Sequence, residues 1–199
     1  MRLCSTLLAL ALALGVSASS GAATRIDHEA ECTYKTLSWS DFRGPVVRGQ
    51  GVAWIASVVV LDPLKIQTEQ VGDGFVARPR NAVVYALMNK LESGAQPGGR
   101  NDRTLAHEQL HFDISEYHAR LLIRELAATE VSGSEGGPAL ANQLHAKVAK
   151  IYERTMRDLF TMQARYDGET VHGTKSRQQK KWVIRVTELL AAEEPYDLK

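Results

Sequence analysis

The stretch Thr104-Leu105-Ala106-His107-Glu108-Gln109-Leu110-His111-Phe112-Asp113-Ile114 decides the architecture that we expect for this chain. It opens a segment, residues 104–129, that contains no proline or glycine and carries apolar residues at helical spacing. Residues four apart lie on one face of a helix, about 6 Å apart along its axis. The segment is therefore predicted to be a long helix that presents His107 and His111 on the same face.

The pattern His-Glu-x-x-His within this stretch indicates a metal site. Two imidazoles one helical turn apart can bind one ion, usually zinc. Glu108 directly follows the first histidine, so its carboxylate can reach a zinc-bound water and take its proton as a general base. The alternative without a metal is a helix that carries two surface histidines by chance. We expect a Zn²⁺ site with His107 and His111 as ligands.

A catalytic zinc ion takes three protein ligands and keeps one position open for water, so the motif is one ligand short. His118 shares the helix face but lies about 10 Å beyond His111 along the axis, too far to bind the same ion. We expect His118 to have a surface or packing role. Asp113 points to the opposite side of the helix, where it could orient a partner or satisfy a buried contact.

The third ligand should come from the C-terminal third of the chain. His172, in a turn-like stretch after the second long helix, is the preferred candidate. Asp167 and Glu169 in the same stretch remain alternatives, with Glu153 on the second helix as an outsider. Tyr166 could donate a hydrogen bond to the oxyanion that forms when hydroxide attacks a carbonyl. Its other interpretation is a half-buried packing tyrosine.

Residues 1–23 have the pattern of a secretory signal peptide: Met-Arg, an apolar run from Leu3 to Val16, and small residues up to Ala23. The run is short for a membrane span, so we expect no stable span after cleavage following Ala18 or Ala23. Residues 24–199 then form a single domain, secreted or periplasmic. Cleavage removes Cys4, so Cys32 has no partner for an internal disulfide.

Charge and composition limit the partners. The net charge is +1, from 24 basic and 23 acidic residues, which gives no electrostatic case for nucleic acid. We expect a peptide or protein substrate and no nucleic-acid partner.

The remaining pattern predicts strands before the motif helix and two helices after it. Residues 52–61 and 64–71 are predicted strands, and a tight turn at Gly72-Asp73 leads into a strand at 75–78. Residues 82–88 favour either a strand or a short helix. The glycine-containing segment 131–138 ends the motif helix, and helices are predicted at 139–165 and about 175–192. Together these elements form an α+β domain, a small antiparallel sheet followed by three helices.

Three blocks of the chain carry a family likeness: Leu37–Gly44, Leu105–Ile114 and Tyr166–Gly173, the last followed by Gln178 and Trp182. On these blocks the chain resembles a family of secreted bacterial proteins called domain of unknown function 922, predicted to be zincin-like metallopeptidases. The resemblance implies a zincin-like fold, His107 and His111 as zinc ligands, Glu108 as the catalytic base and His172 as the third ligand. The family usually has glycine where Leu110 stands, so local helix packing or substrate approach would differ here.

These patterns lead to one expected function and one alternative. The expectation is a secreted or periplasmic zinc metallopeptidase that hydrolyses peptide bonds through zinc-activated water, with Glu108 as the base. In zincins an edge strand beside the motif helix commonly aligns the peptide, and a strand within residues 52–88 would take this role. The alternative is a non-catalytic zinc-binding or interaction domain of the cell envelope with the same fold.

Overall fold

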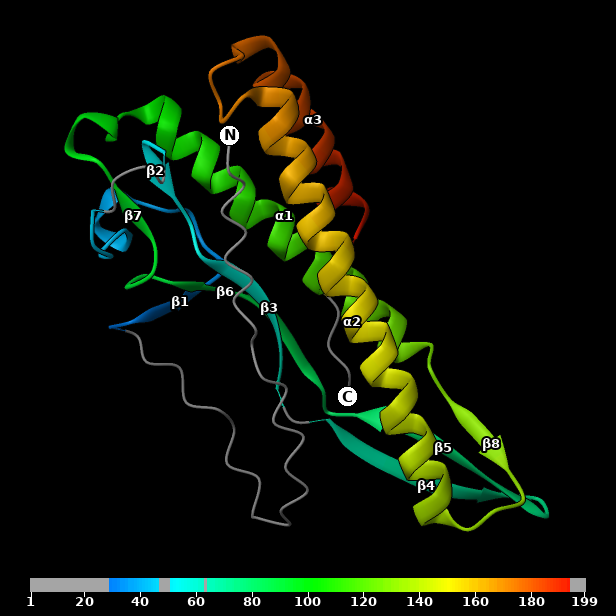
Figure 1. Ribbon diagram of the computed structural model, residues 1–199. Coiled ribbons are helices and arrows are strands. Elements are labelled where there is room, and N and C mark those ends of the chain that lie inside the picture. Colours follow the sequence, from blue (N-terminus) through cyan, green and yellow to red (C-terminus); the bar gives the residue numbers. More distant parts are fainter. Residues whose placement is uncertain (1–28, 47–50, 63, 194–199) are drawn as a thin grey trace, which may run out of the picture.

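A computed structural model describes residues 29–46, 51–62 and 64–193 of the chain (Figure 1). The predicted signal peptide, residues 1–23, lies outside the described residues. Within the described ranges, three α-helices pack against small antiparallel sheets, so the predicted α+β class is confirmed. None of the helices in this part of the chain combines the length and the apolar character that crossing a membrane requires.

Helix α1, Asp102–Ala127, is the predicted motif helix and lies at the centre of the fold (Figure 1). Asn101 caps it, since its side-chain oxygen accepts a hydrogen bond from the Thr104 amide at 3.0 Å. One side of α1 packs on strands β3 and β6, and the other side contacts helices α2 and α3. Because α1 is covered on both sides, His107 and His111 are buried rather than displayed on a surface.

The strands form three small sheets in the described part of the chain, rather than the single sheet that the sequence predicts. The strand orders are β1-β6-β3, β2-β7 and β4-β5-β8, and all described pairings are antiparallel. The bounds are β1 Glu31–Thr33, β2 Ala53–Trp54, β3 Ser57–Asp62, β4 Lys65–Val71, β5 Gly74–Arg80, β6 Val83–Asn89, β7 Gly94–Ala95 and β8 Val131–Gly133.

The predicted hairpin is confirmed, as β4 and β5 pair from Lys65 opposite Arg80 to Val71 opposite Gly74. Gly72 in its turn has a φ of +60°, a conformation that glycine adopts without strain. Residues 83–89 form strand β6, which decides between the strand and the short helix predicted there.

The predicted strand 52–61 is two strands in the structure. Strand β2 pairs with β7, whereas β3 pairs with β6. Between them the Ala56 amide donates to the Ser93 side-chain oxygen at 2.8 Å, so the chain changes partners at this point. The continuous apolar pattern of residues 52–61 gives no sign of this change. Strand β8 lies in the segment 131–138, which is predicted only to end the motif helix, because the edge of β5 offers backbone partners there.

Helix α2, Gly137–Thr170, is longer than the predicted 139–165, and α3, Ser176–Ala192, agrees with its prediction. The stretch from Tyr166 to Thr170 is therefore helical and not a turn. Buried positions Leu159, Tyr166 and Thr170 continue the stripe of α2, and the Thr170 hydroxyl donates to the Tyr166 carbonyl at 2.8 Å. Packing of this stripe outweighs the helix-breaking tendency of Gly168.

The segment 37–44 anchors the N-terminal part of the chain to α1. Leu37 and Phe42 are buried in one apolar cluster with Phe112 of α1, and Trp39 packs against that cluster within a short 3₁₀ helix, Trp39–Asp41. The Leu37 amide donates to the Gln109 side-chain oxygen at 2.7 Å. This anchor fixes the first turns of α1, where the motif begins.

Candidate metal centre

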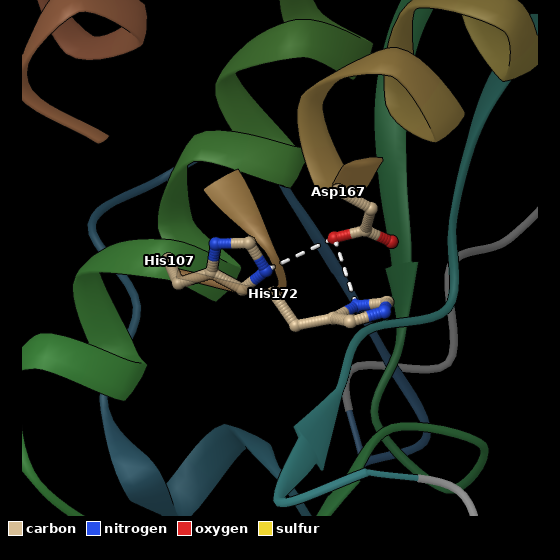
Figure 2. Close-up of side chains that lie close together, drawn as sticks. All are labelled: His107, Asp167 and His172. Atoms are coloured by element: carbon tan, nitrogen blue, oxygen red, sulfur yellow. Dashed lines mark hydrogen bonds and ion pairs between the residues drawn. The ribbon is translucent and has the colours of Figure 1, made fainter. Parts of the chain in front are cut away.

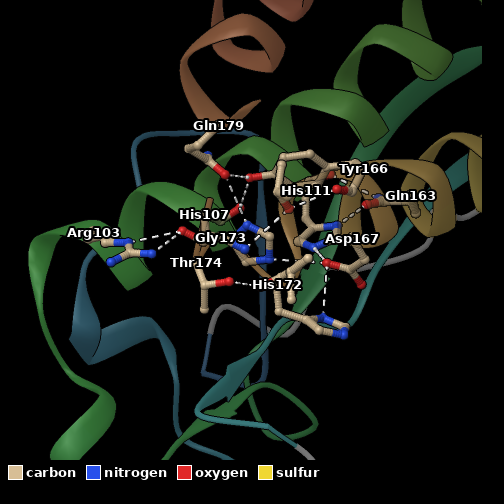
Figure 3. A network of polar contacts seen from close by, with 12 residues as sticks. Arg103, His107, His111, Gln163, Tyr166, Asp167, His172, Gly173, Thr174 and Gln179 are labelled. Atoms are coloured by element: carbon tan, nitrogen blue, oxygen red, sulfur yellow. Dashed lines mark hydrogen bonds and ion pairs between the residues drawn. The ribbon is translucent and has the colours of Figure 1, made fainter. Parts of the chain in front are cut away.

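The two motif histidines lie side by side on one face of α1, as the spacing predicts (Figure 3). Their ring centroids are 4.9 Å apart and the ring planes are nearly perpendicular, at 85°. The Nε2 atoms of His107 and His111 lie 3.1 Å and 3.0 Å from the same atom, Oδ1 of Asp167 on α2. The structure thus brings together two nitrogens from one helix and one carboxylate oxygen from another.

The opposite nitrogen of each ring faces a glutamine. His107 Nδ1 lies 3.3 Å from Oε1 of Gln179 on α3, and His111 Nδ1 contacts Oε1 of Gln163 on α2. The Gln163 amide group donates to the His111 carbonyl at 3.0 Å, which fixes its oxygen toward the ring. An amide oxygen can only accept, so both Nδ1 atoms carry hydrogen and both Nε2 atoms are directed at Asp167.

Tyr166 packs against the His107 ring and hydrogen-bonds to the groups around it. Its side chain is fully buried, its ring stacks on His107 at a centroid distance of 4.7 Å, and its hydroxyl donates toward the Gln179 oxygen at 2.8 Å and the His107 carbonyl at 3.2 Å. This placement does not favour the predicted contact of Tyr166 with an oxyanion, because the hydroxyl is occupied by groups behind the imidazole. Its position instead fixes the orientation of His107 and Gln179.

His172 lies beside Asp167 but is held much more loosely (Figure 2). Its Nδ1 is 3.3 Å from Asp167 Oδ1, and its side chain is 74% exposed, against 31% for Asp167. The candidate ligand atoms of His107, Asp167 and His172 all lie within 4.8 Å of one another. Both C-terminal candidates are therefore within reach of the motif, Asp167 from a helix and His172 from the turn that follows it.

The turn that presents His172 is left-handed over three residues. Val171, His172 and Gly173 have φ values of +50°, +49° and +73°. Arg103 of α1 holds the turn, since its guanidinium donates to the Gly173 carbonyl at 2.7 Å and 2.9 Å (Figure 3). A Cβ atom on Gly173 would lie 3.0 Å from the His107 ring, so this close approach requires glycine.

The other two carboxylates considered for the third ligand point elsewhere. Glu169 bonds to Arg165 at 2.6 Å and to the Trp182 indole N–H at 2.9 Å, on the outer side of α2. Glu153 is exposed and lies outside the group of side chains around the histidines. These two alternatives are set aside because the helical extension of α2 turns Asp167, and not Glu169, toward α1.

Glu108 lies beside the histidines and is almost completely buried, with 3% exposure. Burial raises the pKa of its carboxyl, and the neighbouring His111 and His107 partly oppose that rise. The carboxyl lines a pocket of about 690 Å³, which also borders both motif histidines, Asp167 and His172. The walls come from residues 51–55, the start of α1, the last part of α2 and the turn after it.

Asp167 and His111 form a coupled pair. Burial alone would raise the pKa of the Asp167 carboxyl, but hydrogen bonds from His107 and His111 outweigh burial and hold that pKa well below its usual range. Burial alone would lower the pKa of His111, but the hydrogen bond that its ring donates to Asp167 and the charge of Glu108 raise that pKa above 6.5. Without a metal, the Asp167 carboxylate therefore favours the protonated form of His111.

The two residues excluded as ligands lie where the helical geometry predicts. His118 is buried away from this pocket, and its Nδ1 lies 2.9 Å from the Ile114 carbonyl. Asp113, on the opposite side of α1, accepts hydrogen bonds from the Tyr34 hydroxyl at 3.0 Å and the Gln109 amide at 2.8 Å. Both side chains serve packing and do not contact the histidine cluster.

Gln163 and Gln179 are functional candidates that reasoning from the sequence missed. Gln179 is buried on the same stripe of α3 as Trp182 and Val186, and a polar residue in an apolar stripe is the signal that could have identified it. Gln163 precedes Asp167 by one helical turn, a signal that appears only once α2 is known to continue past Arg165. The resemblance drew attention to Gln178, which is half-buried and lies beside the site residue.

Comparison with known proteins supports the family resemblance for the central part of the chain. Residues 101–173 match the model of a family described as bacterial protein of unknown function, DUF922. The matched segment contains α1, α2 and the turn after it, and so includes every candidate ligand; Gln179 and strand β2 lie outside it. Comparison with curated proteins and with solved structures gave no match.

Proposed function

We propose that this protein is a zinc-dependent peptidase whose ion is held by Nε2 of His107, Nε2 of His111 and the carboxylate of Asp167. The observation that carries the proposal is that each of the two imidazoles makes contacts through both of its ring nitrogens. Each ring donates its Nδ1–H to a glutamine oxygen and directs its Nε2 at one common point. In zinc proteins, such partners on the far nitrogen fix the tautomer and orientation of a ligating histidine.

Three distances between candidate ligand atoms, all measured from Asp167 Oδ1, fit zinc. Ligand atoms about 2.0–2.1 Å from a tetrahedral zinc ion lie about 3.3 Å from one another. Asp167 Oδ1 is 3.1 Å from His107 Nε2, 3.0 Å from His111 Nε2 and 3.3 Å from His172 Nδ1. The proposal ranks Asp167 above His172 as the third ligand, reversing their order from the sequence, because Asp167 lies on a rigid helix between both Nε2 atoms.

Glu108 is the general base in this proposal. A bound zinc ion would supply Lewis acidity, which lowers the pKa of water and polarises a carbonyl group. Glu108 borders the same pocket and follows His107 directly, so its carboxylate is placed to accept the proton of the attacking water and to return it to the departing amine. Burial raises its pKa, which makes the carboxylate a stronger base toward the proton of the attacking water.

Strand β2 is the element proposed to align the peptide. The Gln96 amide donates to the Val52 carbonyl at 2.8 Å, so Val52 and Gln96 form a hydrogen-bonded pair of the β2-β7 ladder. Antiparallel pairs alternate, and the N–H and C=O of the next residue, Ala53, therefore point away from β7. Ala53 borders the pocket, so an extended peptide could pair with this edge of β2.

One observation favours a second function, a zinc-binding domain without catalysis. His172 lies at ligand spacing from Asp167, and four protein ligands would close the coordination shell as in structural zinc sites. Against this, the side chain of His172 is largely exposed and extends from a turn, whereas the other three candidates lie on helices.

The Glu108→Gln variant separates the two functions. Zinc-loaded wild type and Glu108→Gln are incubated with a randomised peptide library, and products are identified by mass spectrometry. The peptidase predicts one zinc ion in each protein and cleavage by wild type alone, with a loss of at least about a hundredfold in the variant. Zinc in both proteins with no cleavage by either would support the binding domain and contradict the peptidase.

A further inference from the structure

The mouth of the pocket carries exposed apolar side chains. Val52 before β2, Phe160 on α2 and Val171 in the left-handed turn are 50%, 58% and 43% exposed, and all three line the pocket that contains the motif histidines. They come from three distant parts of the sequence and meet at one opening. Exposed apolar surface gathered around a pocket marks a place where an apolar group binds.

Val171 is also held in an unfavourable backbone conformation. It occupies the position after α2 with a φ of +50°, where glycine is the usual residue and a β-branched side chain is strained. Strain of this kind concentrates where a side chain has a functional position to fill. Here the strained backbone places an isopropyl group at the rim of the pocket.

The charges around the pocket point to the same kind of ligand. The charged or ionisable groups among its described lining are the three histidines, Glu108 and Asp167, which all belong to the proposed metal centre. Every other lining residue in the described ranges is uncharged. Apart from these five groups, a charged side chain entering the pocket would lose water and meet no charged partner in the described lining, whereas an apolar side chain would gain contact.

We propose that the protein acts on polypeptide segments with a bulky apolar side chain next to the cleaved bond, and that Val52, Phe160 and Val171 contact this side chain. This inference rests on the proposed peptidase function and adds the class of substrate. Val52 lies just before β2, Phe160 lies on α2, and both line the pocket, so they select the side chain while β2 aligns the backbone.

The test compares two fluorogenic peptides that differ only in the residues flanking the cleaved bond, leucine and phenylalanine in one and glutamate and lysine in the other. Zinc-loaded wild type should show a kcat/KM about tenfold higher or more for the apolar peptide. Phe160→Ala and Val52→Ser should each lower kcat/KM for that peptide by about tenfold and lower it much less for the charged peptide, so that the preference for the apolar peptide falls. The matched control is Ile184→Ala, which removes a side chain of similar exposure, 59%, from α3 outside the pocket.

Equal cleavage of both peptides, or an unchanged preference in Phe160→Ala and Val52→Ser, would overturn the inference and leave the peptidase proposal standing. If wild type cleaves neither these peptides nor a random library, the peptidase proposal fails. The preference of the pocket for an apolar side chain is then tested separately, by fluorescence anisotropy with zinc-loaded Glu108→Gln. Selective binding of the apolar peptide that Phe160→Ala abolishes supports it, and no selective binding overturns it.

Discussion

At the scale of single residues, the two glutamines behind the imidazoles determine how well the histidines are oriented. Gln179 is buried, and its oxygen serves both His107 and Tyr166. We predict that Gln179→Ala lowers zinc affinity about 10–100-fold, because His107 loses the group that fixes its tautomer. Competition with a chromogenic chelator measures this. Gln178→Ala, one position earlier on α3 and only half-buried, is the control and should bind zinc like wild type.

A second prediction concerns the Asp167–His111 pair and the pH dependence of stability in protein from which a chelator has removed any metal. The folded pKa of His111 is raised above 6.5, so its contribution to stability is present below that pH and is lost as pH rises through the folded value. The folded pKa of Asp167 is lowered below 3.8, so its contribution is present above that pH and is lost in acid. The pair therefore stabilises the fold most between these limits.

Urea unfolding of metal-free wild type and Asp167→Asn tests this at two pH values. We expect wild type to have a higher free energy of unfolding than the variant. This difference should be larger at about pH 5.5 than at about pH 8.5. If the difference in free energy of unfolding between wild type and Asp167→Asn stayed constant, or grew toward alkaline pH, the two side chains would not be coupled in this way.

The motif residues could be predicted from the sequence, but their partners could not. His107, Glu108 and His111 sit in one helical turn, so local spacing fixes their arrangement. Gln163 and Gln179 reach the same rings from two other helices, and their role depends on how α2 and α3 pack against α1. That packing is set by long-range contacts, which a local pattern does not encode.

At the scale of elements, the C-terminal end of α2 places Asp167. Gly168 lies inside this helix, and a Cβ atom there would meet nothing within 4 Å. We predict that Gly168→Ala stabilises the protein by roughly 0.5–1 kcal/mol, as alanine does in a helix interior. Thermal unfolding measures the change. If residues 166–170 were instead a turn that needs glycine, the substitution would destabilise the protein.

Gly173, only five positions later in the same region, should respond in the opposite way. Its φ is +73°, and a Cβ atom would press on the His107 ring at 3.0 Å. We predict that Gly173→Ala destabilises the fold by about 1 kcal/mol or more and lowers zinc affinity, because His107 must move. Calorimetric zinc titration of Gly173→Ala beside Gly168→Ala checks this, and wild-type affinity in both variants would contradict it.

The elements themselves were predictable where a strong periodic pattern and clear end signals coincide. The motif helix, the β4-β5 hairpin and α3 have both, and all three are confirmed. The end of α2 was hidden by Gly168, whose helix-breaking tendency is weaker than the packing of Tyr166 and Thr170. The division between β2 and β3 was hidden because both strands are apolar and only their partners differ.

At the scale of the whole molecule, α1 lies between the sheets and the other two helices (Figure 1). The candidate metal centre joins α1 to α2. A ligand that binds only the folded state raises the free energy of unfolding by RT ln(1 + L/Kd), where L is the free ligand concentration, so tighter binding gives greater stability. We predict that zinc raises the unfolding temperature of the whole domain in a single transition, and that the His107→Ala/His111→Ala double variant shows no such rise. Differential scanning calorimetry with and without zinc measures both.

The central claim is that the paired imidazoles of α1, together with Asp167, hold one zinc ion, and the most direct measurement of it is metal content. Wild type, His107→Ala/His111→Ala, Asp167→Ala and His172→Ala are dialysed against zinc, desalted and analysed by inductively coupled plasma mass spectrometry. The account predicts about one zinc ion per wild-type chain and per His172→Ala chain, and little or none in the other two variants. Wild type without zinc, or equal zinc in all four proteins, would contradict it.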